Sequence, residues 1–181
     1  MSGSFVNKST TDREKIRGFS NTRNTVHVLV YTGEDLAHRD MRKFIEVVYR
    51  NFEELNTSPE LNHTRYEISR VVTSRKSFVL IATINGLIVG YILAEATTVE
   101  NLRQLMHIYY LYTSPTYRGH GIATYLMNVL QKYSQKLNIP AISLTFDTYN
   151  KQLEKFYLAN GFVYDSNLRS YQRNDMLVKY I

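Results

Sequence analysis

Hydrophobic residues recur along the chain with two different periods, and each period predicts one kind of element. Short apolar runs, continuous or alternating with polar residues, are typical of strands. They occur at 26–31, 77–84, 87–96, 105–113, 141–146, 162–165 and 170–181. Only Asn85 and Gly86 separate the second run from the third, and Asn-Gly favours a tight turn between antiparallel strands.

Other segments place apolar residues three and four positions apart, which is the spacing of an amphipathic helix. They are 34–55, 63–74, 122–137 and 150–160. The strand at 105–113, the helix after it and the strand at 141–146 form a unit whose two strands run parallel. The order β-α-α-β-β-β-α-β-α-β-β predicts a mixed α/β fold of the α+β type, with a mostly antiparallel central sheet and one parallel strand pair.

The basic charge is concentrated at the start of the chain. The 181 residues include 22 Lys and Arg against 16 Asp and Glu, a formal net charge of +6. Residues 1–25 are polar and hold five basic and two acidic side chains, so we expect a flexible tail before a single domain at 26–181. This charge and the 15 tyrosines leave a nucleic-acid-binding module as one alternative. Most of the tyrosines fall within apolar strand or helix patterns, which favours core packing over base stacking.

Several classes of protein and site are excluded by what the sequence lacks. The chain has no cysteine, which excludes disulfides, thiolate metal sites and a cysteine nucleophile. His27, His38 and His63 show no metal-ligand spacing. The N-terminal residues lack the apolar core of a secretion signal, and no run approaches the ~20 apolar residues that cross a bilayer. We therefore expect a soluble cytoplasmic protein without a metal or a membrane partner.

The stretch RGHG at 118–121 joins the predicted strand at 105–113 to the helix after it. It does not complete a dinucleotide-binding fingerprint, because Thr124 stands where a third glycine is needed, and the Gly-Lys-Ser/Thr of a P-loop is absent. A strand, a turn and a helix start nevertheless direct several backbone N–H groups at one point. Gly119 and Gly121 would let a phosphate approach the backbone, so the stretch is either a simple tight turn or an anion site.

The segments around this turn resemble the two acetyl-CoA motifs of the GNAT-superfamily N-acetyltransferases. The first motif, Gln/Arg-x-x-Gly-x-Gly/Ala, is matched by Arg118, Gly121 and Ala123. The pattern Leu-x-Val-x-Pro at the end of the preceding strand is matched by Leu111, Thr113 and Pro115, with threonine in place of valine. The second motif is matched by Asn150, Tyr157, Gly161 and Phe162. The resemblance covers 26–181 and implies the GNAT fold, in which the parallel strand pair splays apart.

What the resemblance implies is a site for acetyl-CoA as a co-substrate. The pantetheine arm would lie between the splayed strands and pair with the backbone of Leu111, Tyr112 and Thr113, where an N–H would polarise the thioester carbonyl. Asn150 would hydrogen-bond the arm. The pyrophosphate would rest on the turn and the helix start, namely Arg118, Gly119, His120, Gly121, Ile122 and Ala123. An amine would attack the acetyl carbon directly, with no covalent enzyme intermediate and no metal.

Proton transfer is less defined by the resemblance. Tyr157 matches the position that often protonates the leaving thiolate, although it is also explained as a buried helix aromatic. For the general base, His107 stands where some histone-type members carry glutamate, and Glu95 on the preceding strand and a water-mediated path are alternatives. A histidine on a strand is often structural.

The acceptor is expected to be a primary amine, either of a small molecule or of a protein or peptide. The resemblance places its binding regions at 52–70 and 164–173. A catalytically silent acyl-CoA-binding domain of the same fold is the alternative to an enzyme. Dimers are common in this family, so a homodimer is a further expectation.

Overall fold

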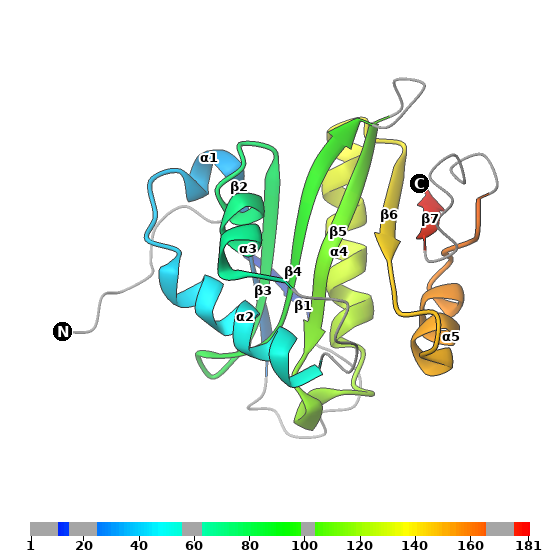
Figure 1. The fold of residues 1–181 in the computed structure, drawn as a ribbon, viewed down its shortest axis with the longest axis horizontal. Helices are drawn as coiled ribbons and strands as arrows, with labels where there is room; N and C mark the ends of the chain where they lie inside the picture. The colour runs from blue at the N-terminus through cyan, green and yellow to red at the C-terminus, as the bar shows by residue number, and fades with distance from the viewer. Residues whose placement is uncertain (1–10, 15–24, 56–62, 99–103, 166–175) are drawn as a thin grey trace.

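The computed structural model describes residues 11–14, 25–55, 63–98, 104–165 and 176–181. These residues form a seven-stranded sheet with helices on both faces (Figure 1). In order across the sheet, the strands are β1 (Thr11–Glu14), β2 (Val26–Thr32), β3 (Ser77–Ile84), β4 (Leu87–Thr98), β5 (Gln104–Thr113), β6 (Ala141–Thr145) and β7 (Met176–Tyr180). Every neighbouring pair is antiparallel except β5 and β6, which are parallel. The predicted fold class is therefore confirmed.

The parallel pair is short. β5 and β6 are joined at Met106↔Ile142, His107↔Ser143 and Ile108↔Leu144. Beyond Ile108, β5 continues to Thr113 against β4, while no described strand pairs with its other edge. The backbone groups of residues 109–113 that point away from β4 therefore lack a strand partner within the described part of the chain.

A β-bulge lies where β5 leaves β6. Leu93 of β4 is opposite Tyr110, and Ala94 is opposite Ile108, so Tyr109 is an extra residue in β5. Ile108 belongs to the core under α4, whereas Tyr109 and Tyr110 both pack on the opposite face. The bulge therefore breaks the usual alternation of side chains between the two faces.

The helices are α1 (Gly33–Leu36), α2 (Arg42–Leu55), α3 (Arg65–Val72), α4 (Ile122–Lys136) and α5 (Lys151–Ala159), with a 3-10 turn at Pro115–Tyr117. The predicted continuous helix at 34–55 is wrong, since the chain leaves helical geometry between α1 and α2. Thr32 and Asp35 form a capping box that starts α1. The Asp40 carboxylate then accepts a hydrogen bond from the Arg42 backbone N–H at 3.1 Å, which gives α2 a start of its own. Within the described residues, no helix combines the length and hydropathy that crossing a membrane requires.

Two hydrophobic cores lie on opposite faces of the sheet. On one face, Ile122 and Leu126 of α4 pack against the sheet, and Gly90 of β4 allows this approach because a Cβ there would lie 3.0 Å from Ile122 Cγ2. On the other face, α1, α2 and α3 cover the sheet, with Phe44 and Ile68 among the buried side chains. The first core places the start of α4 beside the end of β5.

Local predictions at the turns and at the C-terminus had different outcomes. The Asn-Gly turn is confirmed, since Asn85 and Gly86 adopt positive φ values of 50° and 79° between β3 and β4. The strand predicted at 162–165 is wrong, because only Val163 pairs, in an isolated bridge with Val178 of β7. Residues 170–175 of the last predicted strand lie outside the described residues.

The first strand was not predicted. β1 pairs antiparallel with β2 through Thr11↔Leu29 to Glu14↔Val26. Its sequence TDRE is entirely polar, so no apolar pattern marked it. The remainder of the predicted tail, 1–10 and 15–24, lies outside the described residues, and the domain boundary at residue 26 stays a prediction.

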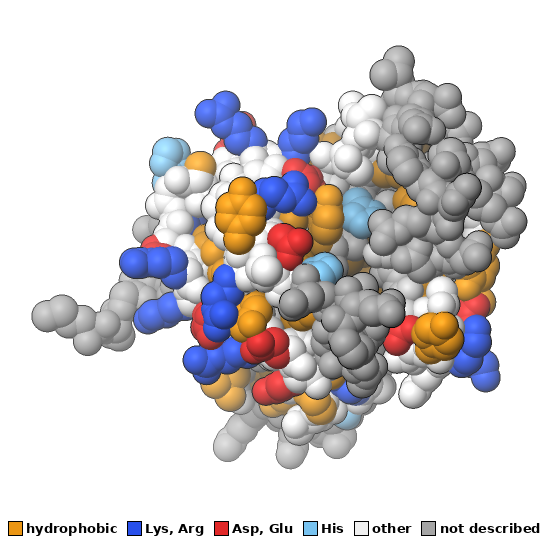
Figure 2. Space-filling view, in the orientation of Figure 1, with side chains coloured by type: hydrophobic (Ala, Val, Ile, Leu, Met, Phe, Trp, Pro, Cys, Tyr) orange, Lys and Arg blue, Asp and Glu red, His pale blue; other side chains and the backbone are white. Residues whose placement is uncertain are grey.

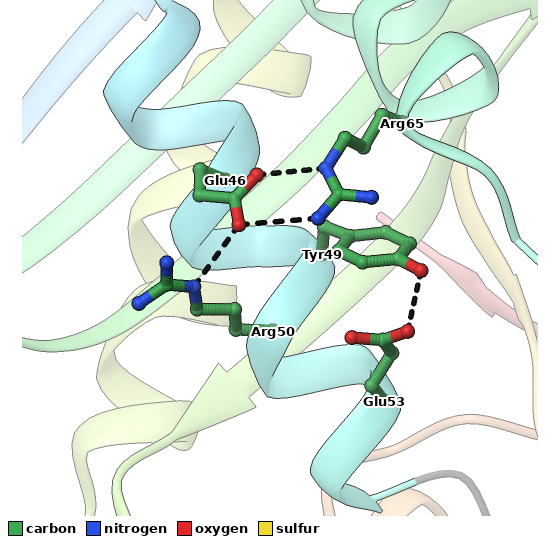
Figure 3. A network of polar contacts seen from close by, with 5 residues as sticks. All are labelled: Glu46, Tyr49, Arg50, Glu53 and Arg65. Carbon is green, nitrogen blue, oxygen red and sulfur yellow. Dashed lines mark hydrogen bonds and ion pairs between the residues drawn. The ribbon is translucent and has the colours of Figure 1, made fainter.

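A polar network joins α2 to α3 (Figure 3). Arg65 of α3 donates to Glu46 of α2 from Nε and Nη2 at 2.8 and 3.2 Å, and Arg50 donates to the same carboxylate at 3.0 Å. The Arg65 guanidinium also lies 3.7 Å from the centre of the Tyr49 ring, and the Tyr49 hydroxyl donates to Glu53. Hydrogen bonds from Arg65, then Arg50, hold the pKa of Glu46 at about 2. The network fixes the two helices that flank residues 56–62.

Candidate active site

The end of β5 contains an unsatisfied polar atom. Thr113 Oγ1 is buried and, among the described residues, has no hydrogen-bond partner. A buried hydroxyl without a partner costs about 1–3 kcal/mol, so it needs an explanation. Thr113 lies on the part of β5 that has lost β6 as a neighbour. Leu111 packs on the α4 side and Tyr112 on the opposite side, where its ring stacks 5.2 Å from that of Tyr91.

The turn after β5 leads into a helix start that no side chain caps. Gly119 and Gly121 have φ values of 76° and 81°, in the left-handed region that favours glycine. Gly121 is the N-cap of α4 and provides no side-chain hydrogen bond, so the first backbone N–H groups of the helix, beginning with Ile122 and Ala123, keep their donors available. The Arg118 side chain turns back to β5, where Nε donates to the Thr113 carbonyl at 3.2 Å. His120 Nδ1 lies 2.9 Å from the carbonyl oxygen of Arg118.

Two further predicted residues lie on α5. Asn150 is its N-cap, and the side-chain oxygen accepts a hydrogen bond from the Leu153 backbone N–H at 3.0 Å. Tyr157 is 6% exposed and packs among Phe146, Phe156 and Phe162. Burial raises the pKa of Tyr157 to about 12. Tyr157 thus belongs to the core on the α4 side.

The two alternative bases are neighbours on the opposite face. Glu95 of β4 lies directly opposite His107 of β5, so both side chains share one face of the sheet. His107 Nδ1 is 2.9 Å from the Ser143 hydroxyl of β6, and the Ser74 hydroxyl donates to Glu95 at 2.5 Å. The His107 ring also contacts Tyr109, with ring centres 4.8 Å apart. The structure therefore brings Glu95 and His107 together where β5 and β6 still pair, and separates them from Tyr157 by the sheet.

One polar pair at this face was missed from the sequence. His63, just before α3, lies with Nδ1 2.5 Å from the hydroxyl of Tyr110 on β5. His63 showed no metal-ligand spacing, and Tyr110 stood among several strand tyrosines. Nothing in the local pattern of either residue indicated a contact across 47 positions.

The surface over α2 and α3 carries mixed charge (Figure 2). Basic and acidic side chains are interspersed there, as the Arg65–Glu46 and Arg42–Asp40 ion pairs illustrate. The described side chains on this face do not form the continuous basic surface typical of a nucleic-acid interface. Within the described residues, no group of three or more His, Asp or Glu side chains is arranged to hold a metal ion. The predicted absence of a metal stays a prediction.

Comparison with known proteins identifies the family. Residues 40–162, which include β5, the turn, α4 and α5, match the profile of the Acetyltransferase (GNAT) family. The chain belongs to this family. The GNAT profile also covers the β5–β6 pair and the bulge, so the predicted resemblance is confirmed.

Other proteins agree with the GNAT assignment. An uncharacterized N-acetyltransferase of Methanocaldococcus jannaschii is 24% identical over 140 residues, and the match covers 75% of this chain but only 62% of the relative's length. The structure of the NatC complex bound to Gag peptide and CoA superposes with a TM-score of 0.62 at 18% identity, over 85% of this chain and 98% of that chain. An aminoglycoside acetyltransferase from an uncultured soil metagenomic sample gives a TM-score of 0.58 at 17% identity, over 75% and 86% of the two chains. These structural matches show that the GNAT fold is shared.

Proposed function

We propose that this chain transfers the acetyl group of acetyl-CoA to a primary amine. The observation that carries the proposal is the end of β5, where the strand loses β6 as a partner and where Thr113 Oγ1 is buried without a hydrogen-bond partner among the described residues. An extended arm with amide groups, such as pantetheine, fits this edge because it supplies both strand-like hydrogen bonds and a partner for the hydroxyl. Family membership supports the same ligand.

The turn and the start of α4 fit the pyrophosphate of acetyl-CoA. A Cβ at Gly119 would meet no atom within 4 Å, so the space beside this residue is open. Free N–H groups and the positive end of the 15-residue helix α4 favour an anion there. In this proposal the backbone of 118–123 binds phosphate oxygens, and Asn150, whose oxygen caps α5, offers its amide N–H₂ to the arm.

Two proton transfers are needed, one to the leaving thiolate and one from the attacking amine, and the candidate residues for them lie on opposite faces of the sheet. A thioester between β5 and β6 has Tyr157 on the α4 side, where the leaving thiolate departs, and Glu95 and His107 on the other side. A pKa of about 12 makes full proton transfer from Tyr157 to a thiolate of pKa ~8.5 unfavourable by roughly 5 kcal/mol. We therefore propose that Tyr157 stabilises the thiolate mainly as a hydrogen-bond donor. Backbone N–H groups of 111–113 orient the carbonyl, and positioning supplies most of the rate.

The proposal is tested in two steps. Thermal unfolding is measured with and without acetyl-CoA, and release of free thiol is then followed after adding amines. We expect acetyl-CoA to raise the Tm and at least one amine to release thiol. No stabilisation by millimolar acetyl-CoA would contradict both catalysis and binding.

The catalytically silent alternative and the acceptor are decided by the same assay. Stabilisation without turnover on any amine favours an acyl-CoA-binding domain. The panel contains a lysine-free peptide with a free N-terminus, a lysine peptide with a blocked N-terminus, spermidine and sisomicin. Among the solved neighbours, the NatC complex is bound to a Gag peptide and an aminoglycoside acetyltransferase is bound to sisomicin. Residues 56–62 and 166–173 of the two predicted acceptor regions lie outside the described residues. Cytoplasmic location and dimerisation stay predictions.

A further inference from the structure

His63 and Tyr110 form a hydrogen-bonded pair that is held by aromatic contacts. The distance from His63 Nδ1 to the Tyr110 hydroxyl is 2.5 Å. The ring of Phe52, on α2, stacks on His63 with centres 4.7 Å apart and meets Tyr110 edge-on at 6.2 Å. Three segments therefore fix one histidine–tyrosine pair.

The pair lies beside the proposed position of the thioester. Tyr110 immediately precedes 111–113, the residues proposed to pair with the pantetheine arm, and its side chain is on the face away from α4. His107 is four residues before Leu111, so it lies on the order of 10 Å away from the proposed arm-binding residues along β5. His63 itself belongs to 52–70, one of the two regions proposed to bind the acceptor. Tyr110 is therefore nearer than His107 to the proposed position of the thioester along β5.

We propose that His63 receives the proton of the acceptor ammonium through the hydroxyl of Tyr110. The ammonium gives one proton to the Tyr110 oxygen, and the Tyr110 hydroxyl proton passes to His63 Nδ1. The neutral amine then attacks, the C–N bond forms and the C–S bond breaks. The second proton leaves the nitrogen for the departing thiolate, and the His63 imidazolium releases its proton to solvent. This inference rests on the proposed acetyl transfer and names its base.

The surroundings of the pair suit a relay. The charged groups that face it from α3 are Glu67 and Arg70, and its titratable neighbours on the sheet are Tyr109 and Tyr91. Phe52, its contact on α2, is uncharged. Burial, followed by the charge of Glu67, raises the pKa of Tyr110, while Arg70 opposes this shift. The phenol therefore stays protonated and passes a proton on to the imidazole nitrogen that lies 2.5 Å from its oxygen.

The test compares His63→Gln and Tyr110→Phe with wild type, using the amine of the panel that gives the fastest thiol release. We expect each variant to lose about 10²–10⁴-fold in kcat/KM, the usual effect of removing a general base. We expect kcat/KM of the wild type to fall toward acidic pH, and we expect this fall to disappear in His63→Gln. The double variant should be no slower than the slower single variant, because both residues serve one transfer. The rise in Tm with acetyl-CoA should persist and shows that each variant is folded.

Matched variants separate this role from its rivals. His38→Gln makes the same chemical change at an exposed loop position and should keep the wild-type profile. The proposal is overturned if His63→Gln still loses kcat/KM toward acidic pH. It is also overturned if His107→Gln abolishes that loss, and the proton is then assigned to His107. Wild type that turns over no amine contradicts the acetyl transfer itself, which is a different outcome.

Histidine NMR tests the pair without turnover. In Tyr110→Phe the imidazole loses the hydrogen bond that its neutral form accepts, so the His63 titration should move to higher pH while that of His38 stays unchanged. An unchanged His63 titration would show that the pair is absent in solution and would overturn the relay, whatever the kinetics.

Discussion

Tyr157 is a phenol whose acidity is reduced by its surroundings. Its pKa of about 12 follows from burial among Phe146, Phe156 and Phe162. Tyr157→Phe keeps the ring and removes the donor, and a hydrogen bond to a charged group contributes about 1.5–3 kcal/mol. We expect kcat to fall about 10–100-fold with little change in acetyl-CoA affinity. Steady-state kinetics measures kcat, and the Tm shift with acetyl-CoA measures binding. An unchanged kcat would show that Tyr157 has only a packing role.

The Thr113 hydroxyl should lower stability in the absence of ligand. Thr113→Val removes a buried oxygen that has no partner among the described residues, so the free energy of unfolding should rise by about 1 kcal/mol in urea titrations. The added stability from acetyl-CoA should shrink if the hydroxyl contacts it. Thr83→Val is the matched control, since the Thr83 hydroxyl donates to the His27 carbonyl and its loss should give no gain. Equal effects of both variants would contradict the unpaired state of Thr113.

At the scale of elements, the proposed phosphate site in the turn before α4 can be tested by substituting Gly119, with Gly86 as a control whose substitution causes the same backbone strain. Gly119 and Gly86 have φ values of 76° and 79°, and a Cβ at either meets nothing within 4 Å. Alanine at each should cost about 1–2 kcal/mol of stability through backbone strain alone. Only Gly119→Ala should also weaken acetyl-CoA binding, measured by calorimetry, because its Cβ enters the space proposed for pyrophosphate. Equal affinities in the two variants would refute the phosphate site.

The network between α2 and α3 predicts a pH dependence of stability. The pKa of Glu46 is about 2 in the folded chain against an ordinary value of 4.5, so its contribution is present above pH ~4.5 and is lost as pH falls toward 2. Arg65→Ala should lower the urea midpoint of unfolding at pH 7. The difference in midpoint between wild type and variant should become smaller as the pH falls from about 4.5 toward 2. The Tyr49 stacking lost with Arg65 is independent of pH. A difference that stays constant down to pH 2 would assign the effect to stacking alone.

The elements differ in how far local sequence determined them. The Asn85–Gly86 turn was predictable because those two residue types accept positive φ. The break before α2 was not predictable, since Met41 continues the apolar spacing, whereas the Asp40 carboxylate accepts a hydrogen bond from the Arg42 backbone N–H where the new helix begins. β1 carries no apolar signal because an edge strand can pair through its backbone alone.

For the whole molecule, the gap beside β5 predicts where acetyl-CoA changes backbone protection. Amides within 109–113 that point away from β4 have no described strand partner. Hydrogen exchange there should slow on adding acetyl-CoA, while the β3–β4 turn stays unchanged. 3′-Phosphoadenosine 5′-diphosphate, which keeps the pyrophosphate of CoA and lacks the arm, should protect 118–123 but not 109–113. Protection of 109–113 by this compound would contradict placement of the arm.

Sequence motifs were enough to propose a cofactor site, but they did not indicate the His63–Tyr110 pair on the acceptor side. The residues at 111–123 that we propose for the cofactor lie close together in the chain and follow a family pattern, so local sequence sufficed to propose them. His63 and Tyr110 are joined only by tertiary structure, across α3 and two hairpin strands. Contacts of that kind depend on how helices settle on the sheet, which periodicity does not encode.

The extra residue in β5 also decides which face of the sheet each following side chain of the strand occupies. Deleting Tyr109 would let β5 pair with β4 without interruption, and each side chain from Tyr110 to Thr113 would exchange faces. Leu111 would then point toward α3, and the Tyr110 hydroxyl would leave His63 for the core under α4. The number of residues in this half of β5, as well as their types, therefore decides which face each side chain occupies: one residue fewer would keep Tyr110 to Thr113 and move each of them to the other face.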